Sequence, residues 1–459
     1  MAFVRFSSMI LVCFGLLAPL LAQSGGTFTL ETRANYRDSD ELSLPIAFPF
    51  PDDFLPPGAE RGSLNTPDPG SHGEISRISL TIHQAWSARA QAKFKLDTID
   101  KYDRNPTTDD NKIDIDEAWF LYGDFVAEDQ AQSASGWYLK FGKMAKFERQ
   151  NDRRSEGYGV LSTAFNRFED AGIELGAQIG NHFYVKGSFT VGNPVFFRDT
   201  NALAGDNGTD AGNPANGANP QPELGSGFPI FYDADLEDYD FDEPETGIAL
   251  GLKFGDVAAG NVVNLMAFAY NRDLRDTVDM TGSFYGGDLD LLNGVAEELG
   301  PAFAGGLPIE GRKKEEFGVN LWVYWGQFTA FAQYVDQEQA SLPRDGFEIE
   351  AAYTIELPLL GAVAGKPILP WLRPAFRYSE ITNDYAGNAR IYPAPSVWWD
   401  WRKTDYALNA LLYPGLLLTL EYSDNQFLLP VGWRNADETV ISLGWKWNRG
   451  WGDHAAERN

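Results

Sequence analysis

The feature that most constrains this chain is a repeated unit of alternating apolar and polar residues. The clearest copy is Asp170–Gly192, in which two such runs flank the pair Gly180-Asn181. Side chains of a β-strand point alternately to opposite faces, and Gly-Asn between two alternating runs is typical of a tight hairpin turn. The unit is therefore predicted to be an antiparallel hairpin whose strands each have one apolar and one polar face.

The length and the number of these runs indicate the fold class. Each run is about ten residues long, and a tilted strand of ~9–11 residues is long enough to cross a bilayer. About sixteen runs cover most of the chain. The sequence therefore predicts an all-β fold, a transmembrane antiparallel β-barrel of about 16 strands with long external loops. The expected strand cores are Thr27–Tyr36, Glu74–Gln84, Ala88–Thr98, Ile113–Tyr122, Trp137–Phe147, Ala171–Gly180, Phe183–Gly192, Gly247–Gly255, Asn261–Tyr270, Glu316–Trp325, Gln327–Asp336, Phe347–Leu357, Leu372–Ile381, Thr404–Tyr413, Gly415–Ser423 and Thr439–Asn448.

The connections between the runs support the barrel, because short ones alternate with long ones. Outer-membrane barrels of bacteria have short periplasmic turns and longer external loops. Gly180-Asn181 and Pro414-Gly415 are typical of the short class, and the long class includes Glu148–Asp170, the segment 193–246 and Gln337–Gly346. Two connections, Gly123–Gly136 and Pro358–Trp371, are longer than a periplasmic turn is expected to be.

A soluble β-rich protein, such as a propeller or a sandwich, is the alternative fold. A propeller would repeat at a fixed blade period, and the chain has no such repeat. The apolar faces carry aromatic residues near their ends, which is where the two membrane interfaces of a barrel lie. These aromatic residues include Trp137, Phe183, Trp325, Phe347, Tyr413, Trp445 and Trp447.

The first residues read as a secretory signal peptide. Arg5 is followed by the apolar stretch Met9–Leu21 and by the small residue Ala22, so cleavage is expected after position 22. The barrel would then comprise residues 23–459. The sequence has one cysteine, Cys13, which lies within this leader, so the exported chain is predicted to have no disulfide. The expected location is the bacterial outer membrane, in contact with its lipid and lipopolysaccharide.

The charge of the chain excludes one class of partner. The formal net charge is −28, whereas nucleic-acid binding depends on phosphate neutralisation by Lys and Arg. Much of the acid lies in connections, above all in the long acidic external loop predicted at 193–246. The eight carboxylates from Asp233 to Glu245 could bind a divalent cation, but a solvated acidic surface is the favoured interpretation.

The polar faces of the strands are predicted to line the inside of the barrel. A charge that faces lipid costs ~2–4 kcal/mol at the midplane, so the charged faces are assigned to the lumen. About sixteen strands enclose more space than side chains can fill, which leaves an aqueous channel. The cations expected on the lumen wall are Arg77, Arg89, Lys93, Lys95, Lys140, Arg373 and Arg377.

One long connection, Glu148–Asp170, is predicted to fold into the barrel. It is densely charged, yet it contains the apolar segment Val160–Phe165, which a fully solvated external loop would have little reason to carry. The alternative is a solvated external loop with paired charges. Charged side chains around a narrow opening set ion selectivity, and Arg and Lys favour anions. The candidate constriction residues are Glu148, Arg149, Asp152, Arg153, Arg154, Glu156 and Arg167.

A family resemblance follows from the residues on either side of this connection. The run WYLKFGKMAKFER (Trp137–Arg149), followed by NRFEDAGIELGAQIGNHFYVKGSF from Asn166, resembles the phosphate-selective porin O and P family of bacterial outer-membrane porins. The resemblance covers roughly Ile75 to Gly192 and implies trimeric sixteen-stranded channels with a basic constriction. Alginate-export barrels have a similar FG-basic strand. Porins usually end on a terminal aromatic residue, whereas here NRGWGDHAAERN follows Trp447.

The sequence contains no pattern that predicts catalysis. It has neither G-x-S-x-G, nor H-E-x-x-H, nor a P-loop, and no cofactor or metal site is expected. A Ser-His pair on the barrel wall at His83 is the one enzymatic arrangement considered, and it is not favoured.

The predicted function is therefore a porin that lets small hydrophilic solutes diffuse passively, with a preference for anions such as phosphate. Three alternatives remain open at this stage. They are a sugar-type channel, for which the tryptophans at 398, 399 and 401 are the obvious cluster, an alginate-type channel, and a non-conducting surface adhesin or structural barrel.

Overall fold

The computed structural model describes residues 25–40, 43–45, 63–65, 70–100, 114–125, 135–150, 152–165, 169–192, 195–197, 231–233, 241–256, 260–274, 277–280, 286–288, 311–384, 400–429 and 432–451. The predicted signal peptide and nearly all of the predicted acidic loop at 193–246 lie outside these ranges, as do Arg167 and the tryptophans at 398 and 399.

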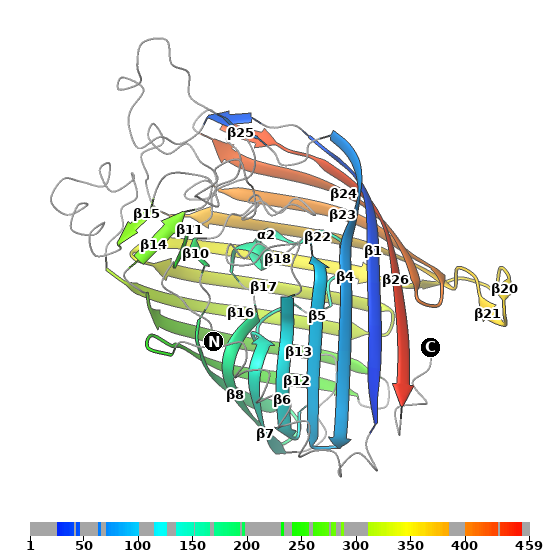
Figure 1. The fold of residues 1–459 in the computed structure, drawn as a ribbon, viewed down its shortest axis with the longest axis horizontal. Coiled ribbons are helices and arrows are strands. Elements are labelled where there is room, and N and C mark those ends of the chain that lie inside the picture. Colours follow the sequence, from blue (N-terminus) through cyan, green and yellow to red (C-terminus); the bar gives the residue numbers. More distant parts are fainter. Residues whose placement is uncertain are drawn as a thin grey trace, which may run out of the picture.

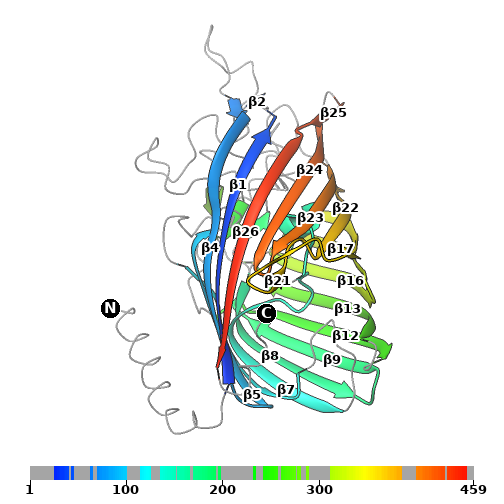
Figure 2. The same ribbon diagram turned by 90° about the vertical axis from the view of Figure 1, so that its right-hand side faces the viewer.

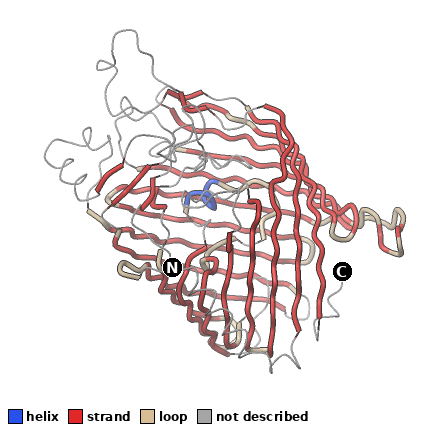
Figure 3. Tube along the Cα trace, viewed as in Figure 1, coloured by secondary structure: helices blue, strands red, loops and turns tan. Residues whose placement is uncertain are grey.

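The described chain forms a closed barrel of sixteen long antiparallel strands (Figure 1; Figure 3). Each long strand pairs with the next one along the chain. All sixteen predicted strand cores coincide with one of them, so the predicted fold class is confirmed. In chain order the strands are β1 (Gly25–Ser39), β4 (Gly70–Ser87), β5 (Ala90–Asp100), β6 (Asp114–Gly123), β7 (Gly136–Ala145), β8 (Glu169–Ile179), β9 (Phe183–Thr190), β12 (Glu245–Asp256), β13 (Asn261–Asp273), β16 (Lys313–Trp325), β17 (Phe328–Gln339), β18 (Leu342–Tyr353), β22 (Trp371–Asn383), β23 (Trp401–Tyr413), β24 (Leu416–Leu429) and β26 (Glu438–Trp451).

The barrel closes by pairing of its first and last strands. β1 pairs with β26 from Gly26↔Trp451 to Ser39↔Glu438 and with β4 on its other side (Figure 2). Closure gives every long strand two neighbours, so no row of backbone N–H and C=O groups is left at an exposed sheet edge. The predicted strand Thr27–Tyr36 therefore lies within the closing strand.

Shorter strands lie at the two ends of the barrel. β10 (Val195–Phe197), β11 (Phe231–Asp233), β14 (Thr277–Met280) and β15 (Gly286–Asp288) form a small sheet at the end that carries the long connections. β2 (Ser43–Pro45) pairs with β3 (Ser63–Asn65), and β25 (Gly432–Asn435) pairs with β24. β19 (Ile355–Glu356), β20 (Ala362–Val363) and β21 (Lys366–Pro367) lie at the opposite end. No helix in the described ranges is long and apolar enough to cross a membrane, and α2 (Val160–Ala164) has five residues.

The outer surface of the barrel is apolar and the inner surface is mostly polar, because strand residues alternate between them. On β12, Ile248 and Leu250 are 55% and 50% exposed on the outside, whereas Lys253 is buried on the inside. β13 carries apolar residues on both faces, and the contacts of its inner face explain why. Its inward Tyr270 stacks on Phe147, with ring centroids 5.1 Å apart, so these apolar side chains pack against chain inside the barrel.

One predicted long connection is wrong. Instead of a long loop at Gln337–Gly346, β17 and β18 continue and are joined by the two-residue turn Ala340-Ser341, with φ values of 49° and 62°. A hairpin turn with two positive φ values normally carries Asn-Gly or a similar pair. Ala-Ser has no such signal, which is why the sequence did not reveal the turn.

The strain at this turn gives a test of the fold. Replacing the exposed Ser341 with Gly (S341G) is expected to raise the free energy of unfolding by up to about 1 kcal/mol, because Gly adopts positive φ more easily. The measurement is urea-induced unfolding of the barrel in lipid vesicles. The reverse change at another tight turn, Gly326→Ala (φ 61°), is the control and should destabilise. A lower stability of S341G would contradict the observed turn.

Candidate functional site

The segment that follows β7, residues 146–165, runs inside the barrel. Its start is tied to two neighbouring strands of the wall. The backbone carbonyl of Glu148 accepts hydrogen bonds from Asn320 Nδ2 on β16 at 2.6 Å and from Gln333 Nε2 on β17 at 3.1 Å. Both amides are buried, and Gln333 also donates to Asn320 Oδ1 at 2.8 Å. Polar residues that the alternation directs inward therefore bind the backbone of this segment.

The middle of the segment is held by a further part of the wall. The Arg154 backbone N–H donates to Glu350 Oε1 on β18 at 2.8 Å, and its carbonyl accepts from Asn409 Nδ2 on β23 at 2.8 Å. The Glu421 carboxylate on β24 accepts from the backbone N–H groups of Glu156 and Gly157. The chain is thus fixed through its own backbone groups, which leaves several of its charged side chains for other contacts.

A buried ion-pair group completes the attachment. Arg377 on β22 pairs with Asp405 on β23, with Nη2 and Oδ2 2.7 Å apart, and donates to the Gly157 carbonyl at 2.8 Å. Lys403 Nζ also pairs with Asp405, at 3.2 Å, and donates to the Tyr158 carbonyl at 3.1 Å. These side chains are fully buried, so the charges neutralise one another and hold the segment at the same time.

The segment reaches the closing strand as well. Glu156 is buried and pairs with Arg33 on β1, with a separation of 2.6 Å between Oε2 and Nη1. Within the described chain, the segment thus contacts inward side chains from β13 round to β24 and then on β1. The predicted inward connection was Glu148–Asp170, and its described residues 148–150 and 152–165 follow this path, whereas a solvated external loop would make no such contacts.

The apolar part of the segment, which forms α2, packs on a flat area of the wall. Gly346 on β18 has no side chain, and an added Cβ would lie 2.2 Å from Leu161 Cδ1 and 3.2 Å from Phe165 Cε2. The guanidinium of Arg344 lies over the Phe165 ring at 4.6 Å. The Val160 N–H donates to Ser379 Oγ at 2.9 Å. Val160–Phe165 is therefore apolar because it is buried against the inner wall.

Glu148 is a buried carboxylate at the start of this segment. Tyr270 donates its hydroxyl to Glu148 Oε2 at 2.5 Å. The neighbouring Lys146 is also buried and pairs with Glu245, which Lys314 approaches to 2.6 Å. Burial raises the pKa of Glu148 to about 7, because the carboxylate has lost its water.

Four of the predicted lumen cations lie on one side of the barrel. Lys93 pairs with Glu117 at 2.5 Å, and Lys95 pairs with Asp116 at 2.5 Å and with Asp97 at 3.1 Å. Arg77, which is partly buried, lies near this group. Lys140 Nζ lies over the Trp119 ring at 5.1 Å. This wall carries acid and base in similar amounts.

The three remaining predicted lumen cations have different surroundings. Arg89 lies in the two-residue turn between β4 and β5, pairs with Asp124 at 3.1 Å, and covers the outward rings of Tyr122 and Trp137. It belongs to the rim, because the turn lies two residues later than predicted and the strand begins at Ala90 instead of Ala88. Arg377 points inward, but the segment covers it. Arg373 donates to Thr354 Oγ1 at 2.8 Å and lies over the Trp371 ring at 4.5 Å.

The remaining candidate constriction residues contact partners of two kinds. Arg149 pairs with Glu169, and Arg154 pairs through both terminal nitrogens with Asp152. Arg153 lies over the Tyr158 ring at 3.4 Å. Arg167 lies outside the described residues. Of the seven candidates, Glu148 and Glu156 are buried and hold the segment against the wall. Asp152 is exposed inside the barrel.

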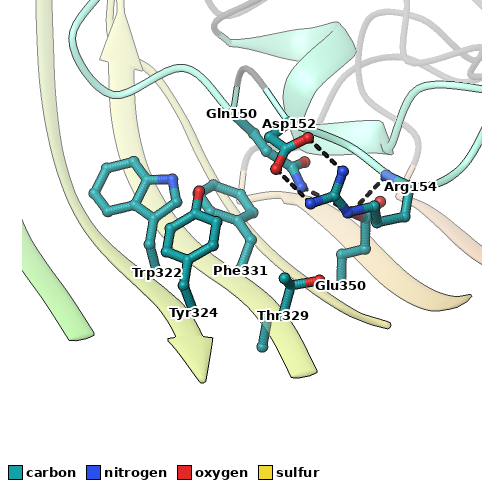
Figure 4. A pocket seen from close by; sticks show the side chains of 9 residues that line it. Gln150, Asp152, Arg154, Trp322, Tyr324, Thr329, Phe331 and Glu350 are labelled. Atoms are coloured by element: carbon teal, nitrogen blue, oxygen red, sulfur yellow. Dashed lines mark hydrogen bonds and ion pairs between the residues drawn. The ribbon is translucent and has the colours of Figure 1, made fainter. Parts of the chain in front are cut away.

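A recess between the segment and the wall contains aromatic residues that sequence reasoning missed (Figure 4). Trp322 and Tyr324 of β16 and Phe331 of β17 lie along one side of it. The sequence does hold a signal, because Trp322 and Tyr324 share the inward parity of Asn320. Polar residues line the rest of the recess, namely Gln150, Asp152, Arg154, Thr329 and Glu350.

Metal binding and a Ser-His pair at His83 are two other kinds of site that the described residues can be compared with. No group of three or more His, Cys, Asp or Glu side chains in these ranges is placed to hold a metal ion. His83, the residue considered for a Ser-His pair, contacts Gln91 Oε1 at 2.8 Å and the edge of Trp119.

Comparison with known proteins places the fold. No protein-family model matches the chain, and no curated protein matches it by sequence. The outer membrane channel DcaP of Acinetobacter baumannii is similar in structure over 93% of this chain and 98% of that one, with a TM-score of 0.50 and 10% identity. OprB of Pseudomonas putida is similar over 94% of this chain and 96% of that one, with a TM-score of 0.46 and 10% identity. The anion-selective porin from Comamonas acidovorans is similar over 93% of this chain and 100% of that one, with a TM-score of 0.44 and 7% identity. At this identity, the likeness to DcaP shows a shared barrel fold.

The packing of α2 can be tested at Gly346. We expect Gly346→Ala to push α2 off the wall, because the new Cβ would overlap Leu161. The backbone amides of residues 160–165 in the folded variant should then exchange hydrogen for deuterium at least about ten-fold faster than in the parent protein. Gly187→Ala is the matched control, since its Cβ would lie 3.7 Å from its nearest neighbour, the Gly247 carbonyl oxygen. Equal exchange rates in the two variants would refute the packing.

The buried Glu148 predicts a pH dependence of stability. A carboxyl whose pKa is raised by folding favours the folded state when protonated, so stability falls as the pH rises from about 4.5 to about 7. The fall attributable to Glu148 is at most about 3 kcal/mol. In Glu148→Gln this part of the fall should disappear, as measured by urea unfolding in vesicles at pH 5 and pH 8. Glu338→Gln, at an exposed position, is the control, and an unchanged pH profile in E148Q would contradict the burial.

Proposed function

We propose that this protein is a bacterial outer-membrane porin through which small hydrophilic solutes diffuse passively. The observation that carries the proposal is a closed barrel whose lumen holds a charged segment fixed by wall side chains. An apolar outer surface is what a barrel needs in lipid, where every backbone polar group must be paired within the protein. The fold shared with DcaP, an outer membrane channel, supports the same function.

The size of the barrel favours a conducting role. Eight strands enclose an interior that side chains fill, whereas porins of about 16 strands leave an aqueous channel. The segment 146–165 occupies part of this interior and narrows the path. Passive diffusion then requires no reaction, cofactor or energy coupling.

The charge pattern favours a weak preference for anions. Lys93, Lys95, Arg149 and Arg154 each have a carboxylate partner within hydrogen-bonding distance, so their fields are largely cancelled. Lys140 and Arg373 instead contact aromatic rings, and a ring contact leaves the positive charge uncompensated. Small anions, phosphate among them, are therefore proposed to be preferred by a modest factor, in place of strict phosphate selectivity.

A sugar-type channel is the second candidate, and the recess beside the segment favours it. Tyr324, which is partly exposed, lies there with the buried rings of Trp322 and Phe331, next to the polar groups of Asp152 and Arg154 (Figure 4). Aromatic rings with a few convergent polar groups are typical of small-molecule sites.

Export by the leader at residues 1–22 and trimeric assembly stay predictions.

The decisive experiment is single-channel recording in planar bilayers across a KCl gradient. The parent protein should give stable openings with a reversal potential of the sign for anions. The variant R149A/R153A/R154A should conduct more, because the segment has lost bulk, and its reversal potential should move toward that of cations. Lys313→Ala, an exposed residue outside the lumen, is the control and should leave both values unchanged.

Each other outcome has a defined meaning. Conductance that is unchanged in the triple variant would place the constriction elsewhere. Openings blocked by a simple sugar, with the block lost in Trp322→Ala, would favour the sugar-type channel. Folded and inserted protein that gives no openings would favour a structural or adhesive barrel.

A further inference from the structure

The connection between β18 and β22 projects from the barrel at the end that carries the short turns (Figure 1; Figure 2). It contains β19 and then the hairpin β20–β21, and it is the connection Pro358–Trp371 that is too long for a simple turn. Neither the channel nor the closure of the barrel requires it. Its extra residues therefore call for a separate explanation.

The projection is strongly apolar and strongly exposed. Leu359, Leu360 and Val363 are 75%, 64% and 55% exposed, which makes the two leucines the most exposed large apolar side chains of the described chain. From 355 to 371 the charged residues are Glu356 and Lys366. Removing such leucines from water would be favourable by about 25 cal/mol for each Å² of apolar surface buried.

The projection has a defined structure. The Leu357 N–H donates to the Pro370 carbonyl at 2.8 Å, and the Ile368 N–H donates to the Gly361 carbonyl at 3.0 Å. The Leu369 N–H bonds the Leu412 carbonyl at the end of β23 at 3.1 Å. Since a two-stranded hairpin alone is at best marginally stable in water, this order points to a supporting surface.

The surface that continues into the projection is the apolar outside of the barrel. Tyr353 at the end of β18 is 51% exposed and Ile355 on β19 is 42% exposed, and both lead directly into it. The neighbouring β16–β17 turn carries Trp325 and Phe328, which are 58% and 39% exposed. Aromatic residues at strand ends mark the membrane interface of a barrel, so the projection begins at interfacial depth.

We infer that this projection is a membrane-anchoring hairpin that lies in the periplasmic leaflet of the outer membrane. Leu359 and Leu360 insert among the acyl chains near the headgroups, and Lys366, which is exposed, reaches the lipid phosphates. The inference rests on the proposed location of the barrel in the outer membrane. Lipid is favoured over a second copy of the chain, because a stable protein interface buries about 1,200–2,000 Å² and a single short hairpin offers far less.

Site-specific fluorescence tests the inference. The chain without residues 1–22 has no cysteine, so Leu360→Cys can be labelled with an environment-sensitive NBD dye and reconstituted into phosphatidylcholine vesicles. We expect blue-shifted emission and quenching by lipids brominated high in the acyl chain. Leu250→Cys on the lipid-facing side of β12 is the control for insertion, and Asn435→Cys at the opposite end of the barrel is the control for exposure to water.

The controls separate the possible results. Quenching at positions 250 and 360 but not at 435 supports the anchoring hairpin. Quenching at position 250 with water-like emission at 360 overturns it and leaves the porin proposal intact. Disulfide-linked dimers of L360C with no lipid quenching overturn it in favour of a second copy of the chain. Absence of quenching at position 250 would contradict the membrane location itself and the hairpin with it.

Discussion

The arrangement of the lumen depends on the buried pair of Arg377 and Asp405. A buried charge is costly unless it is paired, and breaking such a pair by removing one partner costs about 3–5 kcal/mol. Arg377 meets this need through Asp405 and the Gly157 carbonyl together. The same contacts that pair the charges of the inner wall therefore fix the segment that runs inside the barrel. Arg33 and Glu156 extend this coupling to β1, so closure of the barrel and position of the segment support each other.

The strands were predictable from sequence because their period of two is strictly imposed. A shift by one residue would turn every apolar side chain inward, and the cost of that shift fixes the register. All sixteen predicted cores coincide with observed strands. The failures fall where that cost does not act. Ala340-Ser341 closes a hairpin with residues that seldom adopt positive φ, and Arg89 leaves the wall because the turn lies two residues later than predicted.

The site was predictable in part. The mixture of charge and apolar residues in Glu148–Asp170 indicated an inward segment, and wall contacts now surround it. The role of each residue depends on contacts between strands far apart in sequence. Arg377 points inward as predicted, yet the segment covers it, and Glu156 is an anchor because Arg33 lies opposite. Trp322 was not predicted to line the site, because the alternation of apolar and polar residues leads one to expect polar side chains on the inner face.

The central claim is that residues 148–157 lie in the path of the solutes. The most direct measurement is the single-channel current of Asp152→Cys during addition of a water-soluble methanethiosulfonate reagent, since this side chain is exposed inside the barrel and the chain without residues 1–22 has no other thiol. The account predicts a stepwise fall in conductance as each channel reacts, and a reversal potential that depends on the charge of the reagent. Complete modification, verified by mass, with an unchanged current would contradict it.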